Sequence, residues 1–257
     1  MLLIDKLCYQ SNLRYVNAGE KFLYAVLTLC MCIVSRSVLL AVVVLAVNSY
    51  LIVGRGGIPL FRYRNLMLVP LVFLLLSTLA IILNFSKTPL DAFAIPVGNL
   101  YITSSFRSLY QGLQLILTAM ASVSCLYFLA LNTPMTDILN ELRKLRIPGL
   151  LLELMLLIYR FIFVLLEIAS CILTAQKSRL GNRDLKTSVK SFGSMVSVLF
   201  IRSLKKSGAL YDAMESRCYD GTIRVLTENY PPKKAEILLI FVFEIFLLLL
   251  TIWSKLR

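Results

Sequence analysis

The chain has 257 residues, of which 58% are hydrophobic and 16% are charged, and its mean hydropathy is +0.80. Soluble domains have an apolar share nearer half, so this composition excludes an ordinary soluble protein and predicts an integral membrane protein. The formal net charge is +13, but the 27 Lys and Arg residues stand between apolar segments and form no single basic domain. Such a distribution sets membrane orientation and argues against a nucleic-acid-binding protein.

Apolar runs of membrane-spanning length recur along the chain. A helix rises 1.5 Å per residue and needs about 20 residues to cross the roughly 30 Å hydrocarbon core. The first run reaches this length only if its helix begins near Asn17, with Lys21 extending its ammonium group to the interface. The five predicted spans are residues 17–34, 38–53, 66–84, 109–132 and 237–253.

The short loops differ in their basic residues. Three Lys and Arg residues precede the apolar run of the first span, which begins at Phe22, and three lie at 54–65, against one at 35–37 and two at 85–108. Because cytoplasmic loops carry the excess of Lys and Arg, we predict a cytoplasmic N-terminus and a fourth span that ends inside. The loop 85–108 is predicted to lie on the outer side.

The stretch between the fourth and fifth spans is basic and has a helical pattern. Thr133 is a predicted N-cap, followed by Pro134 at the first position of a short amphipathic helix. A long helix is predicted from about Thr187 to Arg217. We therefore divide the chain into an N-terminal transmembrane bundle at 1–132, a cytoplasmic domain of long crossing helices at 133–235, and a C-terminal transmembrane helix at 236–257.

The apolar run at 150–174 has two interpretations. Its length suits a sixth span, but Glu153, Arg160 and Glu167 recur along it at seven-residue spacing. Ionisable groups at mid-bilayer cost several kcal/mol each unless they are paired or hydrated. We favour a helix packed under or partly within the membrane. The predicted fold class is therefore an all-α polytopic membrane protein with about five transmembrane helices.

Some polar residues lie inside predicted spans. Glu244 lies deep in the last span, where an ionisable group is either functional or engaged in a buried helix-to-helix hydrogen bond. Gln111, Gln114, Ser122 and Ser124 lie in the fourth span, where helix packing is a better account of them than a transport path.

One motif occurs twice in the central stretch. The pattern Ala-x-x-Ser-Arg is found at 175–179 and at 213–217, and each copy precedes a predicted helix stop, at Gly181 and Gly221. An arginine at a helix C-terminus is favoured by the helix dipole, by about 0.3–1 kcal/mol, so either copy alone fits a structural role. The planar, permanently charged guanidinium also suits acidic grooves, and the repetition predicts two docking tips for two copies of one partner.

With these motifs the chain resembles the transmembrane (T) component of energy-coupling factor (ECF) transporters, most closely the cobalt-type CbiQ family. The resemblance covers nearly the full length and includes Ile4-Asp5-Lys6…Leu13-Arg14-Tyr15-Val16-Asn17…Glu20-Lys21 and Pro148…Tyr159-Arg160-Phe161. The family's signature is two Ala-Arg-Gly-like tripeptides at the ends of coupling helices. Here they are Ser178-Arg179-Leu180 and Ser216-Arg217-Cys218, in which Ser replaces Ala and Leu or Cys replaces Gly.

The resemblance implies a non-catalytic coupling subunit of an ECF-type ABC importer in the bacterial or archaeal cell (inner) membrane. The two tripeptides would dock two ATP-binding cassette ATPase subunits, and the coupling helices would pass ATP-driven motion to a separate, CbiM-like substrate-binding membrane subunit. Supporting positions on these helices are Ala175, Gln176, Ala213, Met214, Glu215 and Gly221. The implied cargo is cobalt, alternatively nickel or another ECF substrate.

We expect no cofactor and no metal on this chain itself, because ATP would bind the partner ATPases. The absence of histidine removes the commonest transition-metal ligand and the usual neutral-pH acid or base, and the six cysteines form no Cys-x-x-Cys pair. A stand-alone secondary transporter is the alternative class, with Glu244 and the Gln111/Gln114 pair in its favour. No constellation of residues supports a membrane enzyme.

Overall fold

The computed structural model describes residues 3–82, 84–86, 93–97, 100–104, 106–221, 223 and 230–256, with side chains described except at 3, 80–107 and 254–256. The predicted loop 85–108 therefore falls partly outside the described residues, and Lys87 lies among those left out. The chain forms two compact units. We call Leu3–Pro134 with Asn229–Arg257 the membrane unit, and Met135–Glu228 the central unit.

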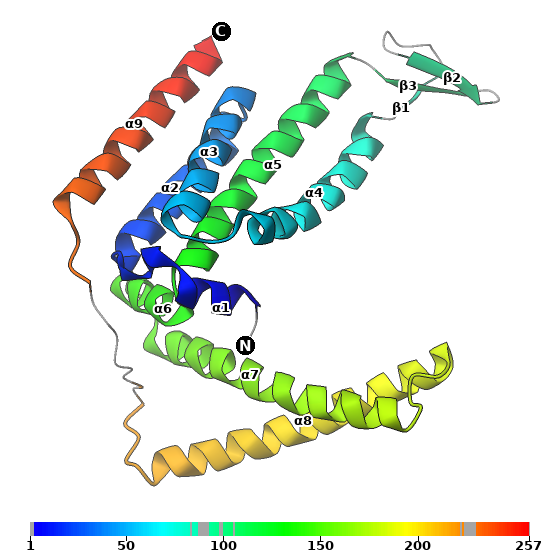
Figure 1. Ribbon diagram of the computed structural model, residues 1–257, viewed down its shortest axis with the longest axis vertical. Coiled ribbons are helices and arrows are strands. Elements are labelled where there is room, and N and C mark those ends of the chain that lie inside the picture. Colours follow the sequence, from blue (N-terminus) through cyan, green and yellow to red (C-terminus); the bar gives the residue numbers. More distant parts are fainter. Residues whose placement is uncertain are drawn as a thin grey trace. The chain divides into compact units, whose positions relative to one another are not determined.

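The membrane unit is a bundle arranged around one helix, α5. Its elements are α1 (Leu3–Gln10), the 3-10 turn η1 (Asn12–Tyr15), α2 (Ala18–Ser35), α3 (Val38–Tyr50), the π-helical turn η2 (Leu51–Arg55), α4 (Leu60–Ile82), α5 (Phe106–Asn132) and α9 (Lys234–Leu256). Helices α2, α3 and α4 pack against α5, and α9 packs against α2 and α3 (Figure 1). The side chain of Asn17 accepts a hydrogen bond from the N–H of Gly19 at 2.8 Å, which confirms the predicted start of the first span.

A small sheet stands in the connection between α4 and α5, where the sequence was interpreted as a loop. Strands β1 (Asn84–Ser86), β2 (Phe93–Val97) and β3 (Leu100–Ser104) are antiparallel in the order β1-β3-β2. Ile102 of β3 lies opposite Phe85 on one side and Ile95 on the other. The fold is nevertheless all-α in its framework, as predicted.

Small and polar side chains bring the helices of the bundle close together. Ala121 and Cys125 of α5 are fully buried, as is Asn48 of α3. The hydroxyl of Tyr24 donates to Asn48 Oδ1 at 2.8 Å, and Asn48 Nδ2 donates to Ser124 Oγ at 2.9 Å. Hydrogen bonds of this kind join neighbouring helices in membranes, so Ser124 serves helix packing.

Six helices are long and apolar enough to cross a membrane by length and composition. The candidate spans are Ala18–Ser35, Val38–Arg55, Leu60–Leu79, Ser108–Asn132, Gly149–Ser178 and Lys234–Trp253. Five of these correspond to the predicted spans. The sixth is the helix at 149–178, for which the sequence left a second interpretation open.

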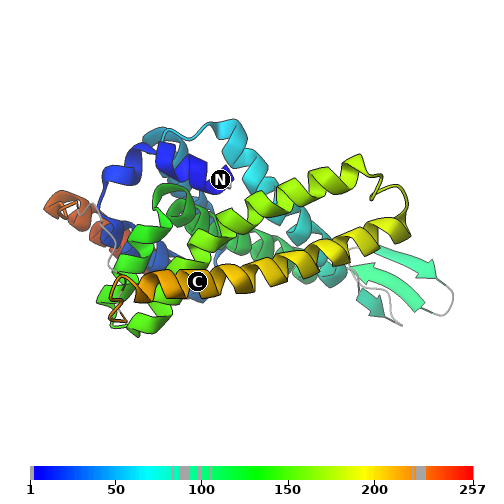
Figure 2. The same cartoon turned by 90° about the horizontal axis from the view of Figure 1, so that it is seen from below.

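The central unit consists of three helices, α6 (Met135–Lys144), α7 (Gly149–Ser178) and α8 (Leu185–Glu215). Helix α7 packs against both α6 and α8, and the two long helices cross at an angle (Figures 1 and 2). The predicted cap of α6 is wrong, because Thr133 Oγ1 is buried and makes no hydrogen bond to any described residue.

Candidate functional site

The two predicted tips stand at the ends of the two long helices of the central unit. Ser178-Arg179-Leu180, the first tip, ends α7, and Ser216-Arg217-Cys218, the second tip, ends α8. All six residues are exposed. Both arginines are therefore accessible from outside the central unit.

The two helix ends share one backbone hydrogen-bond pattern. The N–H of Gly181 donates to the carbonyl of Gln176 at 2.8 Å, and the N–H of Tyr219 donates to the carbonyl of Met214 at 3.1 Å. In both cases the donor lies two residues after the arginine and the acceptor three residues before it. The residue directly after the arginine donates to the carbonyl two residues before it, at 3.1 Å in the first tip and 2.9 Å in the second. Both are Schellman motifs, so the two arginines occupy equivalent positions.

The same motif explains the residue after each arginine. Leu180 has φ of 55° and Cys218 has φ of 56°, which is the left-handed conformation that glycine adopts most easily. These are the two positions where the family signature has Gly. The predicted stops at Gly181 and Gly221 were therefore misplaced, because the left-handed residue that ends each helix is Leu180, one residue before Gly181, and Cys218, three residues before Gly221.

Glycine at these positions is expected to stabilise the tips. Left-handed backbone costs an ordinary L-residue about 1–2 kcal/mol, so Leu180→Gly and Cys218→Gly should each raise the thermal unfolding midpoint of the purified protein. Ala175→Gly is the matched control, because position 175 lies inside α7, where glycine is expected to cost about 1 kcal/mol. A lower midpoint in both tip variants would contradict this account of the motif.

The first tip is tied to the beginning of α8. The side-chain amide of Gln176 donates to the carbonyl of Ser191 at 2.8 Å, and Ser191 Oγ donates to the carbonyl of Gly181 at 2.9 Å. A Cβ at Gly181 would lie 2.9 Å from the Gln176 carbonyl oxygen and 3.0 Å from Ser191 Oγ. Position 181 therefore requires glycine, because the Gln176 carbonyl and the Ser191 hydroxyl leave too little room for a side chain.

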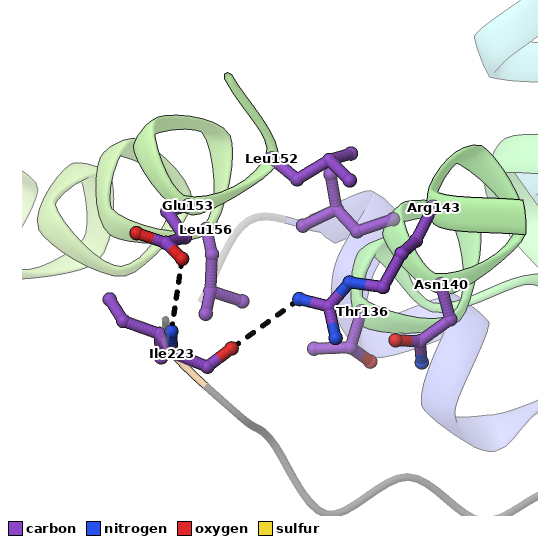
Figure 3. Close-up of a pocket in the computed structure, with 8 residues that line it drawn as sticks. Thr136, Asn140, Arg143, Leu152, Glu153, Leu156 and Ile223 are labelled. Carbon is purple, nitrogen blue, oxygen red and sulfur yellow. Dashed lines mark hydrogen bonds between the residues drawn. The ribbon is translucent and has the colours of Figure 1, made fainter. Parts of the chain in front are cut away.

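The second tip is tied to the beginning of α7. Tyr219 Oη donates to Glu153 Oε2 at 2.5 Å, and the N–H of Ile223 donates to Glu153 Oε1 at 3.1 Å. Arg143 of α6 donates to the carbonyl of Ile223 at 3.4 Å (Figure 3). The hydrogen bond to Glu153 raises the pKa of Tyr219, so its hydroxyl remains a donor at physiological pH.

The groove beside the second tip has two basic side chains and one acidic side chain. It lies between α7 and α8 and is lined by Arg160, Arg217 and Asp220, together with apolar side chains that include Phe163 and Leu210. Neither arginine forms a salt bridge among the described residues, where the ion pairs involve other side chains. Unpaired guanidinium groups next to apolar walls suit an acidic segment of a partner.

Sequence reasoning missed an anchor in the membrane unit. Asn17 Nδ2 donates to the carbonyl of Tyr230 at 2.6 Å, and Glu20 Oε1 accepts from the N–H of Lys233 at 3.0 Å. Both contacts hold the start of α2 against the chain that leads into α9. Asn17 and Glu20 belong to the N-terminal stretch of the resemblance, which therefore has a structural role here.

Lys21 belongs to the same anchor, and the interpretation that it reaches the interface is wrong. The residue is 4% exposed, and its Nζ donates to the carbonyls of Leu13 at 3.0 Å and Asn132 at 2.8 Å. The ammonium group thus satisfies the carbonyl of the last residue of α5. Cations at helix C-termini are favoured by the helix dipole.

Glu244 and Gln114, which favour the alternative of a secondary transporter, belong to the membrane unit, whereas the tips belong to the central unit. Glu244 is 9% exposed, and its Oε1 makes no hydrogen bond to any described residue. Gln114 donates to the carbonyl of Arg36, at the end of α2, and so caps a helix. Within the described part of the chain, no group of three or more His, Cys, Asp or Glu is arranged to hold a metal ion.

Together these features define a polytopic membrane protein whose central unit presents two equivalent arginine-bearing helix ends. The family model described as cobalt transport protein, CbiQ, matches residues 10–228. The chain belongs to this CbiQ family of cobalt transport proteins.

The chain is similar to several proteins whose names state a role in transport. The cobalt transport protein CbiQ of Salmonella typhimurium is 27% identical over 85% of this chain and 97% of its own length. A putative fused cobalt transport protein CbiMQ of Methanocorpusculum labreanum is 32% identical over 96% of this chain and 42% of its own length. The energy-coupling factor transporter transmembrane protein EcfT of Lactococcus lactis is 34% identical over 46% of each chain. The chain is thus similar to transmembrane components of ECF type.

Proposed function

We propose that this chain is the non-catalytic coupling subunit of an ECF-type importer and that it docks two cytoplasmic ATPase subunits through its two tips. The observation that carries the proposal is the repeated backbone geometry of the tips. Two arginines in equivalent Schellman motifs can engage two copies of one acidic groove with the same contacts.

We place both tips on the cytoplasmic side, with α7 outside the bilayer core. The second tip, at the far end of α8, is hydrogen-bonded to Glu153 at the start of α7. If α7 crossed the membrane, α8 would have to cross back to make this contact. Helix α8 is not among the candidate spans and carries five basic residues, Lys186, Lys190, Arg202, Lys205 and Lys206. Burying these groups in hydrocarbon is prohibitively costly.

The proposed cargo is cobalt, and the proposed partner for cargo binding is a separate CbiM-like membrane subunit. The support is the name of the fused CbiMQ relative, of which this chain covers 42%. That protein combines a CbiQ part with a CbiM part in one chain. In this arrangement ATP binds to the ATPase subunits, and the present chain transmits their motion.

Copurification tests the docking function directly. An affinity-tagged chain, coexpressed with the ATPase subunits of its transporter and extracted in mild detergent, should retain two ATPase copies per chain by native mass spectrometry. A stand-alone secondary transporter would be recovered without ATPase subunits under the same conditions. Recovery of the chain alone, from cells that contain folded ATPase, would contradict the proposal.

A further inference from the structure

Glu153 differs in burial from Arg160 and Glu167, the other two ionisable residues that recur at seven-residue spacing along α7. It is 6% exposed, whereas Arg160 and Glu167 are exposed. A buried carboxylate is costly unless hydrogen-bond donors satisfy it. Both of its oxygens accept hydrogen bonds, Oε2 from the hydroxyl of Tyr219 and Oε1 from the N–H of Ile223. The carboxylate and these two residues therefore hold each other in place.

Tyr219 directly follows the second tip, and it takes part both in the Schellman motif of this tip and in the contact with Glu153. Its N–H closes the end of α8 by donating to Met214, and its hydroxyl donates to Glu153. Arg217 lies two residues before it. A displacement of the tip as a body must therefore move α7 or break the bond to Glu153.

Side-chain hydrogen bonds connect each tip to the other long helix. The first tip ends α7 and is tied to α8 through Ser191. The second tip ends α8 and is tied to α7 through Glu153. Each long helix thus carries one tip directly and holds the other through side-chain hydrogen bonds. The second connection involves the carboxylate of Glu153, and hydrogen bonds to a charged group are stronger than those between neutral partners.

We propose that Glu153 is a positioning residue for the second tip. It fixes the position of the second tip, and with it Arg217, relative to the start of α7, so that a displacement of Arg217 also moves α7. The inference rests on the proposed function, because an ATPase subunit supplies the displacement.

The position of the tip can be measured without reference to ATPase binding. Spin labels at the exposed positions Leu150 and Glu215, in a cysteine-free full-length chain, report the distance between the start of α7 and the end of α8. We expect a narrow distance distribution in the parent and a broad one in Glu153→Gln, because the two donors bond to different carboxylate oxygens and the carboxamide replaces one of these oxygens by a donor NH2 group. Tyr219→Phe should broaden the distance distribution less than Glu153→Gln does. The variant that combines both changes should broaden it no more than Glu153→Gln alone. Glu167→Gln, the same change at an exposed site of α7, should leave it narrow.

The complete transporter provides the second readout. Glu153→Gln should lower ATP-driven uptake by about tenfold, the effect of one lost hydrogen bond on coupling, with little loss of bound ATPase. A narrow distribution in Glu153→Gln overturns the positioning role, and so does broadening to the same extent in Glu167→Gln. The docking function fails separately if Arg217→Glu together with Arg179→Glu leaves ATPase recovery unchanged, whatever the distance distribution.

Discussion

Reversing the charge of both tips, by Arg179→Glu and Arg217→Glu in one chain, is expected to lower ATPase recovery by more than about a hundredfold. A hydrogen bond to a charged group contributes about 1.5–3 kcal/mol, so losing one at each tip removes at least about 3 kcal/mol of binding free energy. Repulsion between the new carboxylates and an acidic groove adds to this loss. Recovery is measured by copurification from membranes that contain the tagged chain and the ATPase subunits.

The matched control reverses two charges elsewhere on the same unit. Arg202 and Lys205 are exposed on α8 and lie away from both tips, so Arg202→Glu with Lys205→Glu changes the net charge equally. This variant should retain the ATPase subunits. Each single tip variant should retain an intermediate amount, because one tip remains. An equal loss in the control and in the tip variant would show that overall charge, and not the tips, governs association.

Replacing Lys21 by Met is expected to destabilise the membrane unit by about 3–6 kcal/mol, because two hydrogen bonds from a charged donor are lost. The carbonyls of Leu13 and Asn132 would lose this donor in a site that is closed to water. Such a loss is a large share of the stability of a typical protein, about 5–15 kcal/mol. The thermal midpoint in detergent and the fraction of monodisperse protein both report it.

Lys6→Met is the control for this effect. Lys6 is exposed on α1, so its replacement removes the same charge without removing a buried donor. Its thermal midpoint should match that of the parent. If Lys21→Met also matched the parent, the anchor at the start of α2 would contribute little to stability.

Most of the framework could be predicted from local patterns. The spans follow from apolar runs whose length matches the bilayer, and the start at Asn17 follows from its capping side chain. The position of both arginines at helix ends was predictable because Ala-x-x-Ser-Arg occurs twice. What these predictions share is that each depends on residues close together in the chain.

The features that were missed depend on tertiary contacts or on backbone conformation. Lys21 bonds to a carbonyl 111 residues away, and Glu153 bonds to Tyr219, 66 residues away. Contacts between residues so far apart in the chain cannot be inferred from the periodicity of a single sequence. The helix ends were misplaced because Leu180 and Cys218 adopt a conformation that the usual stop rule assigns to glycine.

Uptake by reconstituted vesicles tests the central claim most directly. Purified chain is placed in vesicles alone, and in parallel together with the ATPase subunits and the substrate-binding membrane subunit, and cobalt uptake is followed with and without ATP. We predict ATP-dependent uptake by the complete assembly and none by the chain alone. Cobalt transport by the isolated chain, with no ATP-hydrolysing subunit present, would contradict the account.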